Sequence, residues 1–136
     1  MTSVMLATYP EVFSAGAIIA GLPYGVAGNV REALSGMRAS PAQSPNKLGD
    51  LVRKASHHKG PWPRLSVWHG SVDGMVAPAN AREIVKQWLD VHRLPPHPMA
   101  EGTVDENWAK QHHSLWLDEE KNKAPTGATP RATPAE

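Results

Sequence analysis

The chain has 136 residues, of which 40% are apolar, so it is long and apolar enough for one ordinary globular domain. Its 14 basic and 13 acidic residues leave a formal charge of +1, which argues against a nucleic-acid binder with a basic surface. Because the chain has no cysteine, a disulfide scaffold, a thiol nucleophile and a cysteine-ligated metal are excluded.

The first half of the chain predicts a helix and then a strand. Thr2–Tyr9 is expected to form the last turns of a buried helix, which must stop before Pro10. Gly16–Ala20 is a continuous apolar run closed by a Gly-Leu-Pro sequence, typical of a strand buried on both faces in a parallel sheet. We then expect a helix near Asn29–Met37, a polar loop with Pro41 and Pro45, and a helix over Asn46–Ala55.

The second half predicts one more strand and the clearest helix of the chain. Arg64–His69 is short, partly β-branched and bounded by proline and glycine, as strands often are. Pro78 suits a first helical turn, and the helix is expected to run to about His92. One face of this helix is apolar and the other polar (Ala81, Ile84, Val85, Trp88 and Leu89 against Arg82, Glu83, Lys86, Gln87 and Asp90).

The order of these elements predicts an α/β fold with two parallel strands and flanking helices. Two parallel strands make a poor sheet alone, so the element count describes part of a domain. No helix can cross the proline-rich segment Leu94–Pro98, which divides a folded part, residues 1–95, from a connector over 96–117. Residues 118–136 carry charges and then a Pro-rich stretch, and are expected to be a disordered tail.

The strongest chemical signal is the segment Trp68–Pro78, which contains the pattern H-G-x-x-D-x-x-V-x-P. It places the carboxylate of Asp73 in a Gly-rich turn after a strand, where open α/β sheets gather catalytic groups. The segment resembles the acid loop of α/β-hydrolases, in which the aspartate orients the catalytic histidine. Alternatively, Asp73 only fixes the turn by accepting backbone N–H groups, and the motif alone leaves both interpretations open.

Longer stretches of the chain resemble one esterase family. The strings MTSVMLATYPEVF and AGAIIAGLPYG, at residues 1–13 and 15–25, are similar to the helix and strand that follow the nucleophile in the polyhydroxybutyrate-depolymerase family, which includes feruloyl and acetylxylan esterases. Gly-Pro-Trp-Pro at residues 60–63 and the 68–78 loop also resemble that family. The resemblance covers about residues 1–95. It implies an incomplete α/β-hydrolase fold, serine-dependent hydrolysis of carboxylic esters, an extracellular protein, and no metal or organic cofactor.

Of the catalytic residues that the resemblance implies, only the acid carries over to this sequence, as Asp73. The chain contains no G-x-S-x-G, and Ser3 lacks flanking glycines and lies in the helix that should follow the nucleophile. His112 and His113 follow the acid in the correct chain order, but no strand is expected before them and no glycine turn flanks them, so we do not expect them to be catalytic. His69 is expected to pack or to bond backbone beside the acid loop.

Other candidate features have weaker signals. Adjacent His57 and His58 point about 100° apart on a helix, so a solvated pair is favoured over a metal site. Leu22–Ala27 follows the first strand and is expected to contact the acyl or alcohol group of a substrate. Relatives have cysteine where Val26 stands, so any disulfide there is absent. Two interpretations are open for the tryptophans Trp62, Trp68 and Trp88. They form an aromatic platform for a substrate, or they pack in the core, and core packing is favoured.

We therefore expect a fragment of a serine-dependent carboxylic ester hydrolase that carries the triad acid, lacks the serine and histidine, and has no turnover alone. The intact protein would act on an ester of a polyhydroxyalkanoate, a short acyl group or a feruloyl group, and would bind neither nucleic acid nor membrane. No apolar run approaches the roughly 20 residues that cross a bilayer. The start lacks a basic signal region, so the chain as it stands is expected in the cytoplasm. The alternatives are a non-catalytic interaction or ligand-binding remnant, or one half of a split esterase.

Overall fold

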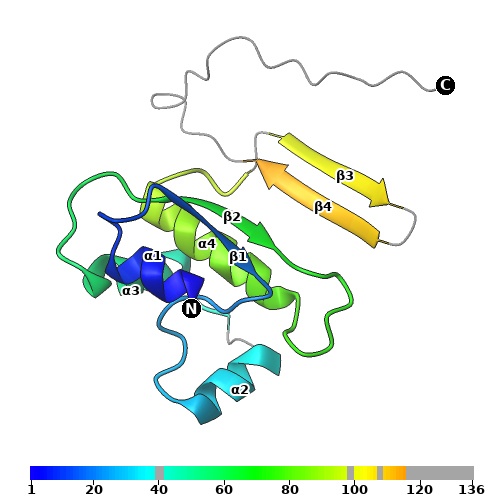
Figure 1. Cartoon of the computed structure of the whole chain (residues 1–136), viewed down its shortest axis with the longest axis horizontal. Helices are drawn as coiled ribbons and strands as arrows, with labels where there is room; N and C mark the ends of the chain where they lie inside the picture. The colour runs from blue at the N-terminus through cyan, green and yellow to red at the C-terminus, as the bar shows by residue number, and fades with distance from the viewer. Residues whose placement is uncertain (39–41, 98–99, 107–108, 116–136) are drawn as a thin grey trace, which may run out of the picture.

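A computed structural model of the chain describes residues 1–38, 42–97, 100–106 and 109–115. Four helices and four strands occur in these ranges (Figure 1). In chain order they are α1 (Thr2–Thr8), β1 (Ala15–Ile19), α2 (Val30–Arg38), α3 (Pro45–Ala55), β2 (Arg64–Trp68), α4 (Ala79–His92), β3 (Ala100–Glu106) and β4 (Ala109–Leu115). None of the helices in the described ranges is long and apolar enough to cross a bilayer.

The central sheet consists of β1 and β2, which pair in parallel from Ala15↔Arg64 to Ile19↔Trp68. The crossover between them carries α2 and α3, so the α/β class, the two parallel strands and the flanking helices are confirmed. Helix α1 packs on β1, and α4 packs on β2 and on α3. The core lies between these helices and one face of the sheet, and its buried apolar residues are Leu6, Ala7, Ile18, Val52, Ile84, Trp88 and Val91.

The expectation that the first strand is buried on both faces is wrong. Exposure alternates along β1, with Ile18 at 3% and its neighbour Ile19 at 73%. In the parallel register Ile18 pairs with Val67 on the core side, whereas Ile19 pairs with Trp68 on the other face. Among the described residues no helix covers that second face. The sheet is therefore packed on one side only, although the sequence of β1 is continuously apolar.

The buried face of α4 also differs from the prediction. Its start beside Pro78 and its end at His92 are confirmed, and Arg93 terminates it in the left-handed region with φ 57°. However, polar residues predicted to face solvent, Glu83 and Gln87, are buried together with Asn80. The predicted apolar members Ala81, Val85 and Leu89 are only half-buried. Helical periodicity assigns faces by polarity, whereas here the buried amides of Asn80 and Gln87 satisfy backbone groups of α2, of α3 and of the loops that follow β1 and β2.

Helices α2 and α3 form close to where the sequence predicts them. The Asn29 side chain accepts the Glu32 backbone N–H at 2.9 Å, and Glu32 in turn accepts the Gly28 N–H at 2.7 Å, so these side chains cap the start of α2. Pro45, expected in the preceding loop, is instead the first residue of α3, a position where its missing N–H costs no helical bond.

The strands β3 and β4 form an antiparallel hairpin that the sequence did not predict. The expectation that no strand precedes His112 and His113 is wrong, because both residues belong to β4 and their register partners Thr103 and Gly102 belong to β3. Ala100–Glu106 contains few β-branched or aromatic residues, so its strand signal is weak. The predicted tail, residues 118–136, lies outside the described residues.

Candidate active site

The predicted acid loop lies where the two strands of the parallel sheet end. Residues 69–78 follow β2, and residues 20–25 follow β1. Because β1 and β2 are parallel and in register, both loops leave the sheet at the same end, where the strands have their carboxyl termini. The structure therefore places Asp73 and the predicted substrate-contacting segment Leu22–Ala27 after the carboxyl ends of neighbouring strands.

Asp73 organises the acid loop through one carboxylate oxygen. Its Oδ1 accepts the backbone N–H groups of Met75 at 2.9 Å and Val76 at 3.0 Å, and its own N–H donates to the Gly70 carbonyl at 3.2 Å. These two N–H donors, Val76 first, lower the pKa of Asp73 below the ordinary 3.8. The carboxylate is therefore ionised at neutral pH, and its turn-forming role is confirmed.

The second oxygen, Oδ2, accepts no hydrogen bond from the described residues. It lies 3.6 Å from Nε2 of His69. That ring nitrogen instead lies 2.8 Å from the Val76 carbonyl, so His69 bonds backbone as expected. The turn-forming interpretation and the acid interpretation of Asp73 are thus compatible, because they use different oxygens.

Gln87 of α4 fixes the loop after β1. Its Nε2 donates to the carbonyls of Tyr24 and Leu48, each at 2.9 Å, and its Oε1 accepts the Tyr24 N–H at 2.8 Å. The side chain is fully buried, so these bonds replace its contact with water. The sequence pattern predicts Gln87 on the solvent-facing side of the helix, because the positions beside it on that face are charged.

Asn80 similarly joins the end of α2 to the end of the acid loop. Its Nδ2 lies within 3.1–3.2 Å of the carbonyls of Gly36, Met37 and Ala77. The Ala77 N–H donates to the Met37 carbonyl at 2.7 Å. The sequence signal for this role was its place two residues after the end of the H-G-x-x-D-x-x-V-x-P motif.

Two of the three candidate tryptophans pack as predicted. Trp88 is buried in the core, and its ring meets that of Trp62 edge-on at 6.5 Å. Trp68 is different, because it is 51% exposed on the uncovered face of the sheet, and its core assignment is wrong. Core packing in that position needs a layer that none of the described residues provides.

The neighbouring histidines do not share a ligand site. His58 places Nε2 3.1 Å from the Pro61 carbonyl and packs edge-on against Trp62, whereas His57 is exposed. Within the described ranges no three histidine or acidic side chains gather in a way that could hold a metal ion. Ser3 lies inside α1, as the sequence interpretation required.

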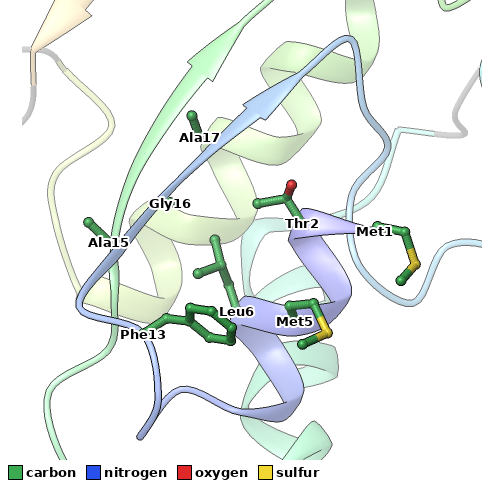
Figure 2. Close-up of a pocket in the computed structure, with 8 residues that line it drawn as sticks. All are labelled: Met1, Thr2, Met5, Leu6, Phe13, Ala15, Gly16 and Ala17. Carbon is green, nitrogen blue, oxygen red and sulfur yellow. The ribbon is translucent and has the colours of Figure 1, made fainter.

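A cavity of about 370 Å³ opens between α1 and β1 (Figure 2). Met5 and Leu6 of α1, together with Phe13 and the β1 residues 15–17, line it. The acid loop contributes none of its lining residues, so this cavity is separate from the Asp73 site. A second hollow of about 390 Å³ lies over both strands at residues 15–16 and 64–66.

Comparison with known proteins identifies esterases as relatives. The chain is 44% identical over 105 residues to poly(3-hydroxyalkanoate) depolymerase C of Paucimonas lemoignei, covering 76% of this chain and 25% of that protein. It is 37% identical to an acetylxylan esterase of Coprinopsis cinerea, covering 82% and 31%, and 35% identical to feruloyl esterase B of Talaromyces stipitatus, covering 69% and 28%. No family model matches the chain.

The fold is also that of a solved esterase. The acetyl xylan esterase from Aspergillus awamori superposes with a TM-score of 0.76 at 24% identity, over 85% of this chain and 44% of that one. The predicted resemblance and the α/β-hydrolase type of fold are therefore confirmed. Similarity over 82% of the chain is longer than residues 1–95, so it extends beyond the predicted limit of the resemblance. The chain spans about a quarter to a third of the three relatives named above.

Proposed function

This chain is related to part of the polyhydroxybutyrate-depolymerase group of esterases, and from that kinship we propose that it is the acid-bearing segment of a serine-dependent carboxylic ester hydrolase. Asp73 is the acid of its catalytic triad. The observation that carries the proposal is the divided carboxylate: Oδ1 holds the turn, while Oδ2 accepts no hydrogen bond from any described residue.

The proposed chemistry follows the serine-triad scheme. A serine attacks the ester carbonyl, a histidine takes the serine proton and returns it to the leaving alcohol, and backbone N–H groups stabilise the oxyanion. The part of Asp73 is to accept the N–H of that histidine at Oδ2 and to stabilise the imidazolium. Its lowered pKa keeps it anionic throughout the neutral range.

We propose that the serine and the histidine of this triad are not among these 136 residues. The sequence contains no G-x-S-x-G in which a nucleophile could stand. The substrates are carboxylic esters of the kinds named by the relatives, namely polyhydroxyalkanoate, acetylated xylan or feruloyl esters. Leu22–Ala27, at the same end of the sheet as Asp73, contacts the acyl or alcohol group. The whole enzyme acts outside the cell.

Esterase assays test the incompleteness of the chain as a catalyst. The purified chain is incubated with p-nitrophenyl butyrate beside its Asp73→Asn variant and buffer, and all three are expected to release p-nitrophenol at the same rate. Hydrolysis above buffer that depends on Asp73 would show that the chain has its own nucleophile and base.

A chimera tests the role of Asp73. Residues 1–95 replace the matching segment of the Paucimonas lemoignei depolymerase, and the chimera is expected to hydrolyse the same ester. Asp73→Asn should then lower kcat on the order of 10⁴-fold, as removal of the triad acid does in a serine protease. Glu11→Gln, a change at an exposed carboxylate, is the matched control and should leave kcat unchanged. An Asp73→Asn chimera that keeps the kcat of the unchanged chimera would contradict the proposal.

A second candidate function, binding to a partner polypeptide or forming half of a split esterase, is favoured by the outer edge of β1. Arg64 N–H donates to the Ser14 carbonyl and Ala20 N–H donates to the Trp68 carbonyl, so even-numbered residues of this segment face β2. The alternation of backbone groups therefore turns the N–H and C=O of Ala15, Ala17 and Ile19 outward. None of the described residues pairs with them, and the cavity beside α1 adjoins this strand (Figure 2).

Co-expression distinguishes the split esterase from the binding remnant. The remainder of the Paucimonas lemoignei depolymerase, without the matching segment, is produced together with the tagged chain and tested for co-purification and ester hydrolysis. A split enzyme predicts both, and a binding remnant predicts co-purification only. Ala17→Pro removes one outward N–H while leaving the bonds to β2, and should abolish co-purification.

A further inference from the structure

The acid loop is held by hydrogen bonds more than by packing. Ser71, Val72, Gly74 and Met75 are exposed, and Val72 and Met75 turn large apolar side chains to solvent. The loop therefore gains little from burial, and its shape depends on the few polar contacts within it. Three of these contacts involve Asp73 itself, through its own N–H and its Oδ1.

The fourth contact comes from His69, which is 5% exposed at its side chain. Its Nε2 lies 2.8 Å from the carbonyl of Val76, so the ring spans from the first residue of the loop to its last turn. A carbonyl oxygen only accepts hydrogen bonds, so Nε2 must carry the proton. Nδ1 is buried and without a hydrogen-bond partner among the described residues, and a proton there would be a buried, unsatisfied donor.

The geometry also keeps His69 from donating a hydrogen bond to Oδ2 of Asp73, the oxygen proposed to accept the N–H of the triad histidine. The distance from Nε2 to Oδ2 of Asp73, 3.6 Å, is too long for a hydrogen bond, and the N–H is already engaged by Val76. The ring thus closes the loop beneath the carboxylate and leaves Oδ2 available to another donor.

We propose that His69 is a positioning residue for the catalytic acid: its Nε2–H tautomer bonds the Val76 carbonyl, closes the loop, and holds the Asp73 carboxylate with Oδ2 presented to the triad histidine. This inference rests on the proposed function of Asp73. It assigns His69 no contact with substrate and no proton transfer.

NMR of the whole 136-residue chain tests the proposal without any catalysis. In the wild type, ¹⁵N shifts of His69 should show a protonated Nε2 and an unprotonated Nδ1. His69→Leu should raise the pKa of the Asp73 carboxyl toward the ordinary 3.8 and speed hydrogen exchange of the Met75 and Val76 amides about tenfold. His69→Gln, which keeps a side-chain N–H donor, should restore much of both.

A distant histidine supplies the control. His58 also bonds a backbone carbonyl, that of Pro61 at 3.1 Å, but it lies outside the acid loop. His58→Leu should leave the Asp73 carboxyl titration and the two amides unchanged. A His69→Leu variant with unaltered carboxyl and amide readouts would overturn the proposal. If that variant does not fold, a wild-type ring protonated at Nδ1 instead of Nε2 would also overturn it.

The active chimera separates this inference from the proposed function. There, His69→Leu should lower kcat by about 10- to 100-fold with a smaller change in KM, the scale expected of a displaced catalytic group, and His69→Gln should recover part of it. If Asp73→Asn leaves the chimera active, the proposed function fails whatever His69 does. If Asp73→Asn inactivates it while His69→Leu changes neither kcat nor the loop, only the positioning role fails.

Discussion

The two oxygens of the Asp73 carboxylate have different environments, and this difference decides how the residue behaves as pH changes. Oδ1 accepts two backbone N–H groups, whereas Oδ2 only approaches His69. Both N–H bonds favour the ionised form, so the pKa of the folded state lies below that of the unfolded chain.

The stabilising contribution of Asp73 is therefore present above the ordinary aspartate pKa of 3.8 and lost as pH falls through the lower folded value. We expect the amide signals of Met75 and Val76 to titrate in that acid window in an NMR series. The pKa of Asp50 is also lowered, by its hydrogen bond with Arg53, so Asp50 is protonated in the same acid window. The control must therefore follow signals at each of the two sites separately. Asp73→Asn should remove the transition at the two loop amides and leave that of the Asp50–Arg53 pair.

Gln87 shows the same dependence on backbone partners in a buried setting. Gln87→Leu keeps the volume but leaves the Tyr24 N–H and the carbonyls of Tyr24 and Leu48 without their partner. We expect a loss of about 2–4 kcal/mol in the free energy of unfolding, measured by urea denaturation. Arg82→Gln, at an exposed position of the same helix, should change it by less than about 0.5 kcal/mol.

Residues of this kind explain why the site could be predicted only in part. The Asp73 turn has a local signal, since glycine, aspartate and proline act over a few positions. His69 was also expected to bond backbone, because it adjoins that turn. Gln87 and Asn80 act on residues 63 and 43–44 positions away, and no local pattern contains that information.

At the scale of elements, helices α1 to α4 and both central strands were predictable from periodicity, with proline and glycine close to many of their ends. The burial of β1 was not, because it depends on which layers cover the sheet. The β3–β4 hairpin was missed for a different reason: its sequence is mostly polar, and strand pairing there follows from the backbone partner more than from propensity.

The contact between α1 and β1 depends on a glycine. A Cβ built on Gly16 would lie 2.7 Å from Cδ1 of Leu6, which is buried in the core, and Figure 2 shows these residues facing each other. Gly16→Ala should therefore cost about 1–3 kcal/mol in the free energy of unfolding, because the core must shift to admit one methyl group. Gly74→Ala, where nothing lies within 4 Å, is the matched control for a thermal or urea unfolding experiment.

At the scale of the whole molecule, the uncovered face of the central sheet is its most unusual property. Ile19 and Trp68 are register partners there, 73% and 51% exposed. Adjacent exposed apolar groups of this size favour association between copies. We expect light scattering to show concentration-dependent oligomers that Ile19→Lys with Trp68→Ser reduces. Val30→Lys, at an exposed apolar residue of α2, should have little effect, and equal effects of both changes would exclude the sheet face as the cause.

Length and composition, taken alone, predict one ordinary domain, whereas the element count predicts part of one. The chain spans 44% of the solved esterase whose fold it shares. Composition counts apolar residues without regard to their partners, so it cannot distinguish a core that is closed from one that is open on a side.

The register of the central sheet sets an order for assembly. Ala15 and Arg64 are 49 positions apart, so β1 cannot pair with β2 until the whole crossover and β2 itself have been synthesised. During that interval the described residues offer β1 no strand partner on either edge, and pairing with β2 then satisfies one of them. A nascent chain at this stage is thus most exposed to mispairing through β1, and a chaperone that shields extended apolar segments would act there first.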